Sequence, residues 1–179
     1  MHLIDPNDFK EAMGSFPSGV VIATTLDEAG RPWGFTASAF SSVSLKPPLV
    51  LLCLAKSADC YSSFAAACVF AVNILRQEDE ALARLFATRG ADKFASDEFR
   101  PGDHGLPVMR NAVASLVCRR YADYDGGDHR IIVGQVESLQ LGAAVNAMVY
   151  FRSRYGRFAP SGELRPSDGD EGASRPGNR

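Results

Sequence analysis

Residues Gly127 to Val136 read Gly-Asp-His-Arg-Ile-Ile-Val-Gly-Gln-Val, which places a histidine directly after a glycine-rich turn and at the start of an apolar strand. Gly126 and Gly127 allow the chain to bend sharply, and the β-branched residues that follow favour an extended conformation. A strand is a rigid base, so we expect the imidazole of His129 to be held at a defined place where it can meet a ligand. The alternative is that His129 only satisfies a hydrogen bond within the hairpin.

The composition is that of one globular domain. The chain has 179 residues, of which 46% are hydrophobic and 22% charged, and its formal net charge is −2. This charge balance argues against nucleic acid as a partner. The apolar runs over residues 48–55 and 64–72 are too short to span a bilayer, and the first residues lack the basic segment of a secretory signal. We therefore expect a cytoplasmic protein that binds neither nucleic acid nor membrane.

The four cysteines and three histidines are scattered along the chain without metal-ligand spacing. Cys53, Cys60, Cys68 and Cys118 each lie within an apolar stretch, where a cysteine behaves as a small buried hydrophobic residue. We expect neither a metal site nor a disulfide.

Strand-like segments dominate, and they do not alternate regularly with helices. This pattern favours a mainly β fold, an antiparallel barrel decorated by helices. The segment from Thr88 to Pro107 is a long polar excursion of the kind that often carries function. We expect strands over residues 19–25, 33–40, 49–54, 68–74, 114–124, 130–141 and 147–151, and helices over 7–13 (capped by Asn7), 58–66 and 78–87.

The last twenty residues differ in composition from the rest. Residues 160–179 are rich in glycine, proline, serine and charged residues, and contain no aromatic residue. Such a segment cannot bury enough apolar surface to offset its ordering entropy. We therefore expect a domain over residues 1–159 and a disordered tail over 160–179.

Two segments could hold a flat ring and a phosphate. Residues 34–44 are crowded with small and hydroxylated side chains, which let a ring lie close to the backbone while N–H and hydroxyl groups satisfy its polar edge. Lys56 and Ser57 lie where a strand gives way to an expected helix, whose N-terminus favours a phosphate. The alternatives are a surface strand with solvated serines, and an N-capping serine beside a solvated lysine.

Two further segments combine basic and aromatic residues. Residues 89–94 lie in the long excursion, and Tyr150 to Gly156 places two arginines and two tyrosines around a strand end. Guanidinium groups there could hold phosphates or stack on rings. The alternatives are a solvated charge cluster in the first segment, and barrel-closing aromatics with exposed arginines in the second.

Several catalytic motifs are missing from the sequence. No Gly-x-Gly-x-x-Gly follows a strand, and no Walker loop, Gly-x-Ser-x-Gly elbow, Cys–His pair or pair of carboxylates is evident. We therefore expect no catalytic side chain of the acid–base or nucleophilic kind.

The chain resembles the flavin reductase-like family of FMN-binding split-barrel proteins, the reductase components of two-component flavin monooxygenases. The similarity covers about residues 9–158 and rests on motifs that are weak alone but follow one another in the family's order. These are Phe-Pro-Ser-Gly-Val at 16–20, Gly-Phe-Thr-Ala-Ser at 34–38 with Ser-Val-Ser at 42–44, Pro47-Pro48, Lys56-Ser57, Lys93-Phe94, Gly-Leu-Pro-Val at 105–108, Gly-Asp-His at 127–129 with Gly134, and Tyr-Phe-Arg at 150–152.

The resemblance implies a split-barrel homodimer with the flavin in a groove near the subunit interface. It implies that His129, Arg152 and Tyr155 meet the nicotinamide nucleotide, whereas the other site residues contact the flavin. A second Gly-Asp-His triplet at 102–104 is set aside, because no strand is expected after it. The cofactor-binding residues expected on this basis are Thr36, Ala37, Ser38, Ala39, Phe40, Ser42, Cys53, Leu54, Ala55, Lys56, Ser57, Asp59, Lys93, Phe94, His129, Arg152 and Tyr155.

The activity that the resemblance implies is an NAD(P)H:flavin oxidoreductase that passes FADH2 or FMNH2 to a separate flavin-dependent oxygenase. The hydride moves directly between the two cofactors, so no acid–base pair is needed. FAD is slightly favoured over FMN, and NADH is favoured because no basic pocket for a 2′-phosphate is evident. Two other interpretations stay open: a non-catalytic protein that stores or senses flavin through the same barrel, and an enzyme similar to pyridoxamine-phosphate oxidases on the related barrel.

Overall fold

The computed structural model describes residues 4–143 and 145–159, and the predicted tail over 160–179 lies outside the described residues. Strands are the main regular element. They are β1 (Ser18–Gly19), β2 (Val21–Leu26), β3 (Pro32–Ala37), β4 (Phe40–Leu45), β5 (Pro48–Ala55), β6 (Val69–Ile74), β7 (Phe99–Pro101), β8 (Pro107–Met109), β9 (Ala114–Gly126), β10 (His129–Leu141), β11 (Met148–Phe151) and β12 (Arg154–Arg157). The helices are α1 (Pro6–Gly14), α2 (Tyr61–Ala66), α3 (Glu80–Ala87) and the 3₁₀ turn η1 (Asp103–Gly105).

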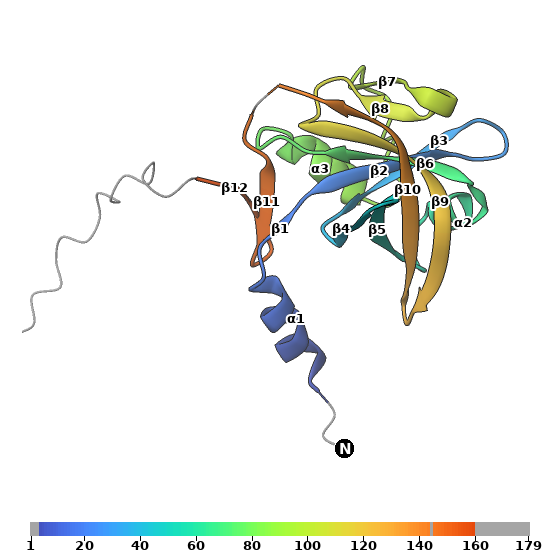
Figure 1. Cartoon of the computed structure of the whole chain (residues 1–179). Coiled ribbons are helices and arrows are strands. Elements are labelled where there is room, and N and C mark those ends of the chain that lie inside the picture. The colour runs from blue at the N-terminus through green and yellow to red at the C-terminus, as the bar shows by residue number, and fades with distance from the viewer. Residues whose placement is uncertain (1–3, 144, 160–179) are drawn as a thin grey trace, which may run out of the picture.

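Seven strands form one antiparallel sheet in the order β3-β2-β6-β9-β10-β5-β4. The two edge strands, β3 and β4, are successive in the chain and separated only by Ser38 and Ala39, so the sheet has to curl round on itself (Figure 1). Smaller sheets, β1-β11-β12 and β7-β8, lie beside this curled sheet. The mainly β, antiparallel fold predicted from the sequence is confirmed.

Strands β4, β7, β8 and β12 of the structure are absent from the prediction. The strand expected over 33–40 ends at Ala37, because the chain bends at Ser38 before β4 begins at Phe40. Strand β12 follows a tight turn at Arg152 and Ser153, whose φ angles of 45° and 61° are left-handed. Glycine or asparagine usually marks such a turn, so the sequence carries no signal for this one.

The first two helices begin at other residues than predicted. Helix α1 begins at Pro6, and the carboxylate of Asp5, not Asn7, caps it by accepting the backbone N–H of Asn7 at 2.7 Å. Helix α2 begins only at Tyr61, without a side-chain cap. Ser57 does not cap this helix. Its hydroxyl instead accepts a hydrogen bond from Arg89, which lies in the segment after α3.

The barrel interior is apolar and closely packed. Leu52, Phe64, Phe70 and Ile132 are fully buried in one cluster. Gly134, singled out in the sequence, lies among them: a Cβ added there would be 2.5 Å from the Cζ of Phe70, so only glycine fits. The role of Gly134 is therefore to admit a core aromatic ring.

The polar excursion from Thr88 to Pro107 is anchored on the barrel by buried hydrogen bonds. The hydroxyl of Thr24 donates to the carbonyl of Pro107 at 2.6 Å. The amide of Asn73, fully buried in β6, accepts the N–H of Met109 at 2.9 Å and the hydroxyl of Ser115 at 2.8 Å, and donates to the carbonyl of Ile22 at 3.1 Å. These bonds hold the far end of the excursion to the sheet.

Helix α1 stands away from the barrel (Figure 1) and buries none of its residues. Ile4, Phe9, Met13 and Phe16, in and beside it, are more than half exposed. In the described part of the chain, no helix is long and apolar enough to cross a membrane.

Candidate functional site

A cavity of about 320 Å³ opens where β3 and β5 end, under the loops that follow β5 and α3. Its lining comes from segments that are far apart in the sequence and are brought together by the curl of the sheet. The residues around it are Phe35, Thr36, Ala37, Ser38, Ala39, Cys53, Leu54, Ala55, Ser57, Ala58, Asp59, Cys60, Phe86, Ala87, Thr88, Arg89, Lys93 and His129.

Small side chains shape one part of the cavity. Ala37, Ser38, Ala39 and Ala55 line it at the ends of the two strands. Backbone polar groups can approach a flat ligand closely beside such residues. The hydroxyl of Thr36 does not donate to a ligand in this arrangement, because it donates to the carbonyl of Ala83 at 2.6 Å. This bond holds α3 against β3. Residues 37–39 and 55 thus leave room for a planar ring.

Aromatic side chains form another part of the cavity wall. Phe35 and Phe86 line the cavity, and Phe86 also packs edge-on against Phe94 with ring centroids 5.2 Å apart. Gly34 permits this packing, since a Cβ there would be 2.8 Å from Cε1 of Phe86 and 2.9 Å from the carbonyl oxygen of Ala23. The rings therefore have fixed positions, which suits them to contact a ring system.

Two loops close the cavity and bind each other. Arg89 donates to the Ser57 hydroxyl at 3.0 Å, and the backbone N–H of Gly90 donates to the Asp59 carboxylate at 2.9 Å. Lys93, from the same loop, donates to the carbonyl of Gly34 at 3.2 Å. Two cations thus lie at the rim of the cavity, where they can bind phosphate groups.

His129 is the first residue of β10 and lines the same cavity, opposite Ala55 in the β5–β10 register. Its Nδ1 lies 2.7 Å from Oδ1 of Asp128, and this hydrogen bond lowers the pKa of the Asp128 carboxyl below its ordinary value. The contact leaves Nε2 as the ring nitrogen that can serve a ligand. The turn before His129 consists of Gly127, with φ of 76°, and Asp128, so it lies one residue later than the predicted Gly126-Gly127 pair.

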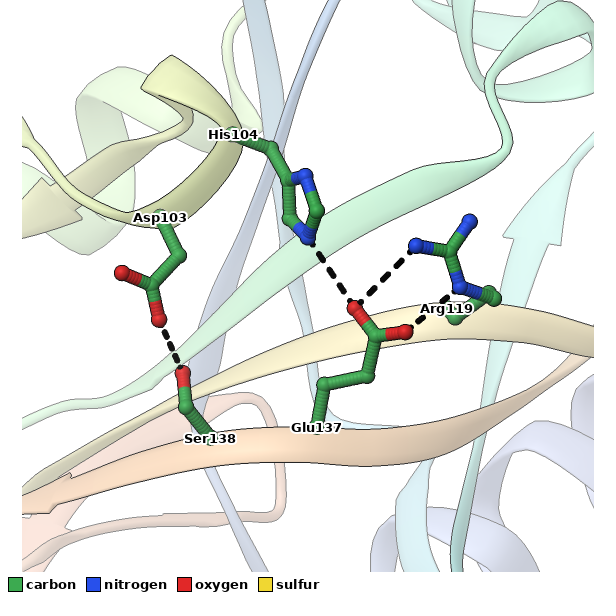
Figure 2. Close-up of polar contacts among 5 residues, drawn as sticks. All are labelled: Asp103, His104, Arg119, Glu137 and Ser138. Carbon is green, nitrogen blue, oxygen red and sulfur yellow. Dashed lines mark hydrogen bonds and ion pairs between the residues drawn. The ribbon is translucent and has the colours of Figure 1, made fainter.

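The second Gly-Asp-His triplet, at residues 102–104, lies outside the cavity, and its Asp and His side chains bind residues of β10. Figure 2 shows His104 pointing at Glu137, which also meets Arg119, while Asp103 binds Ser138. The Nε2 of His104 is 3.0 Å from Oε2 of Glu137, and the hydroxyl of Ser138 donates to Asp103 at 2.6 Å. The expectation that no strand follows this triplet is wrong, because β8 begins at Pro107. His104 nevertheless does not line the cavity.

Several of the predicted site residues lie outside this cavity. Phe40 and Ser42 are in β4, past the bend at Ser38. Lys56 forms an ion pair with Asp125 across the barrel surface, and Phe94 packs on Phe86 and Phe99. The idea that a helix N-terminus at Lys56 and Ser57 attracts a phosphate is wrong, since α2 begins at Tyr61 and has only six residues.

Arg152 and Tyr155 line a different cavity, of about 760 Å³, at the β11–β12 hairpin. Arg154 and Arg157 line it too, and the guanidinium of Arg84 lies 5.1 Å from the centre of the Tyr155 ring. In the single chain, the structure does not bring Arg152 and Tyr155 together with His129.

Other cavity residues are not among the predicted site residues. They are Phe35, Ala58, Cys60, Phe86, Ala87, Thr88 and Arg89. Three of them had a signal in the sequence, because Phe35 belongs to the segment 34–44, Ala58 directly follows Lys56 and Ser57, and Arg89 begins the basic segment 89–94. Phe86 looks like any core residue of an amphipathic helix, and only the packing of α3 on β3 brings it to the cavity.

The thiols beside the cavity are held in their protonated form. Burial raises the pKa of Cys60 to about 11 and also raises that of Cys53. Protonated thiols are weak nucleophiles, so neither cysteine is suited to covalent catalysis. Cys68 is exposed, against the expectation that all four cysteines are buried.

The family model and the relatives that match this chain all point to the same family of proteins. The model of the flavin reductase like domain matches residues 13–159. The chain is 40% identical over 159 residues to the stachydrine N-demethylase reductase subunit of Rhizobium meliloti, covering 89% of this chain and 68% of that protein. It is 40% identical over 157 residues to the reductase component of the 4-nitrophenol 4-monooxygenase/4-nitrocatechol 2-monooxygenase of Rhodococcus opacus, covering 88% and 83%.

A solved structure agrees in fold along its whole length. The NADH:FAD oxidoreductase of Streptomyces globisporus, in complex with NAD and FAD fragments, superposes with a TM-score of 0.82 at 37% identity, covering 90% of this chain and 99% of that one. Coverage is not always so complete: the chain spans 50% of a probable flavin reductase of Rhizobium meliloti to which it is 39% identical.

Proposed function

The chain belongs to the family of flavin reductase-like domains, and we propose that it is an NAD(P)H:flavin oxidoreductase that supplies reduced flavin to a separate flavin-dependent monooxygenase. The observation that carries this proposal is a cavity that combines small residues, fixed aromatic rings, two cations and a histidine. Relatives named as reductase components of monooxygenases support the separate oxygenase partner.

The cavity fits a flavin by its own chemistry. Ala37, Ala39 and Ala55 leave space for a flat ring beside backbone polar groups, and Arg89 and Lys93 offer positive charge for the phosphate. The hydride chemistry is supplied by the bound flavin and nicotinamide themselves. The chain binds the two rings and holds them close together.

NADH and FAD are the preferred cofactors in this proposal. A relative named as an NADH-dependent FAD reductase is 38% identical over 178 residues. We propose the cytoplasm as the location, as the sequence suggests.

The role proposed for His129 is to orient the nicotinamide nucleotide through Nε2. Replacing His129 with alanine should lower kcat/KM for NADH by roughly 3- to 30-fold, because one hydrogen bond to the ligand is lost. The KM for flavin should change little. Steady-state oxidation of NADH with varied flavin and varied NADH measures both.

The matched control for this prediction is His104→Ala, which removes the other Gly-Asp-His histidine and its contact with Glu137. This variant should keep the kinetic constants of the wild-type chain. If His104→Ala were the damaging change and His129→Ala silent, the nucleotide role would belong to the first triplet. If His129→Ala raised the KM values for flavin and NADH equally, its role would be structural.

We propose that two copies of the chain form a homodimer. The unburied helix α1, with Ile4, Phe9, Met13 and Phe16 exposed, supports a surface that a second copy covers. Sedimentation at micromolar concentration should give a dimer. A fully active monomer would contradict this assembly.

A non-catalytic flavin-binding protein is the alternative function. Flavin binding alone needs no second nucleotide, so a histidine with one ring nitrogen available beside the cavity weighs against it. Titration with flavin alone, set against oxidation of NADH in the presence of flavin, separates the two. Binding without turnover would favour the alternative.

A further inference from the structure

His129, which lines the flavin cavity, lies at the outer end of the long hairpin that β9 and β10 form (Figure 1). Strand β6 pairs with β9 only as far as Arg119, so in the sheet the last residues of β9 pair with β10 alone. On the other side of β10, the pairing with β5 reaches Ala55, opposite His129. The turn just before His129 therefore lies beyond the paired part of the sheet, and its position depends on other contacts.

Lys56, the residue after β5, makes two contacts with this end of the hairpin. Its backbone N–H donates to the carbonyl of Asp128 at 2.9 Å, and its ammonium group forms an ion pair with the carboxylate of Asp125 in β9. Asp125 lies opposite Arg130 of β10, so the side chain of Lys56 reaches from the β5 side across β10 to β9. The two contacts hold the end of the hairpin against the loop after β5.

The ion pair lies behind His129 and not in the flavin cavity. Lys56, Asp125 and Arg130 line a separate cavity of about 300 Å³, and His129 is not part of that lining. Successive residues of a strand point to opposite faces, so Arg130 points away from the face on which His129 meets the flavin cavity. Lys56 is also absent from the lining of the flavin cavity. Its side chain can therefore act on the site only through the hairpin.

Asp128 connects the charge of Lys56 with the imidazole. The hydrogen bond with Nδ1 of His129 lowers the pKa of the Asp128 carboxyl, and the charge of Lys56 lowers it further. The hydrogen bond with Lys56 likewise lowers the pKa of Asp125. The ammonium group thus acts on both carboxylates of the hairpin end, one of which holds the ring of His129.

We propose that Lys56 is a positioning residue, which holds the end of the β9–β10 hairpin against the loop after β5 and so fixes the place from which His129 meets the nicotinamide nucleotide. This inference rests on the proposed function, in which His129 orients that nucleotide. Ala55 and Ser57, on either side of Lys56, line the flavin cavity. One short loop therefore sets the position of the histidine relative to the flavin.

The first experiment reverses the charge with Lys56→Glu, which places two carboxylates against each other. The pair is exposed, 41% for Lys56 and 77% for Asp125, which limits the effect. We expect kcat/KM for NADH to fall roughly 5-fold, from the lost attraction and the new repulsion together. The KM values for FMN and riboflavin should stay within about twofold of the wild-type values. The double variant Lys56→Glu/Asp125→Lys restores the attraction and should regain most of the loss.

The second experiment asks whether Lys56 acts through His129. When His129→Ala is already present, Lys56→Glu should cause no further loss of kcat/KM for NADH, because two changes that act through one group do not add. The matched control compares Lys56→Met with Lys46→Met, since Lys46 lies just before the other end of β5. Lys56→Met should lower kcat/KM for NADH about twofold, whereas Lys46→Met should leave every kinetic constant unchanged.

Proton NMR of the histidine rings tests the same contact without turnover. The chain has three histidines, and the variants His129→Ala and His104→Ala identify two of the resonances by their absence. Lys56→Glu should shift the resonance of His129, and the double variant with Asp125→Lys should move it back. The resonance of His104 should stay in place, because this ring binds Glu137.

The outcomes separate a positioning role from other roles. An unchanged kcat/KM for NADH in Lys56→Glu, or an equal loss with and without His129, would overturn the proposal. A KM that rose for FMN and not for riboflavin would place Lys56 at the flavin phosphate and overturn it as well. If Lys56→Glu did not fold, Lys56→Met would take its place in each measurement. If the wild-type chain oxidised no NADH, the proposed function would fail, whereas the His129 resonance would still decide whether Lys56 fixes the ring.

Discussion

Replacing Asn73 with alanine should lower the free energy of unfolding by about 3–5 kcal/mol, because three buried hydrogen bonds are lost and their partners stay buried without replacement. The Asn73 amide binds Ile22, Met109 and Ser115 at distances between 2.8 and 3.1 Å, and the side chain is fully buried. Urea unfolding followed by circular dichroism measures the change.

The matched control is Ser115→Ala, which removes one of these three bonds and leaves the other two. It should cost about 1 kcal/mol. A loss of less than 1 kcal/mol for Asn73→Ala would contradict the role given to this residue. Because Asn73 anchors β8 at the end of the excursion that carries Arg89 and Lys93, we also expect the folded variant to bind flavin more weakly.

Replacing Arg89 with alanine should raise the KM for FMN and FAD by roughly 10- to 150-fold, the range that corresponds to a lost hydrogen bond with a charged phosphate. The guanidinium lies at the rim of the flavin cavity, held by Ser57 at 3.0 Å. Riboflavin lacks the phosphate, so its KM should stay near the wild-type value. Steady-state kinetics with the three flavins measures this difference directly.

Arg110→Ala is the control, because Arg110 belongs to the segment just beyond, is paired with Asp97 at 2.9 Å and does not line the cavity. It should leave all three KM values unchanged. If Arg89→Ala weakened riboflavin as strongly as FMN, the arginine would shape the loop and would not meet the phosphate.

The sequence predicted the elements of the barrel better than their ends. Runs of apolar and β-branched residues identified β2, β5, β6, β9 and β10, because burial on one or both faces leaves a clear pattern. Strand β12 escaped prediction, since its turn uses Arg152 and Ser153 in left-handed conformations without a glycine. The start of α2 was also misplaced, because Ser57 bonds to a loop that is distant in sequence.

Site residues that belong to short sequence motifs could be predicted. Site residues that reach the cavity only through the packing of distant segments could not. Small residues at 36–39, Ser57, Lys93 and His129 carried signals in the sequence, and the structure gathers them around one cavity. Phe86 and Thr88 reach that cavity only because Thr36 and Gly34 let α3 lie close to β3. No local pattern encodes that approach, since it depends on contacts between distant segments.

The central claim is that this chain passes a hydride from NADH to a flavin and then releases the reduced flavin. The most direct test mixes the chain with FAD and NADH without oxygen, follows the visible absorbance of the flavin in stopped flow, and then separates free flavin from protein. The account predicts that the absorbance bleaches at a rate that saturates with NADH, and that reduced flavin is recovered free of protein. Flavin that binds to the chain and stays oxidised in the presence of NADH would contradict it.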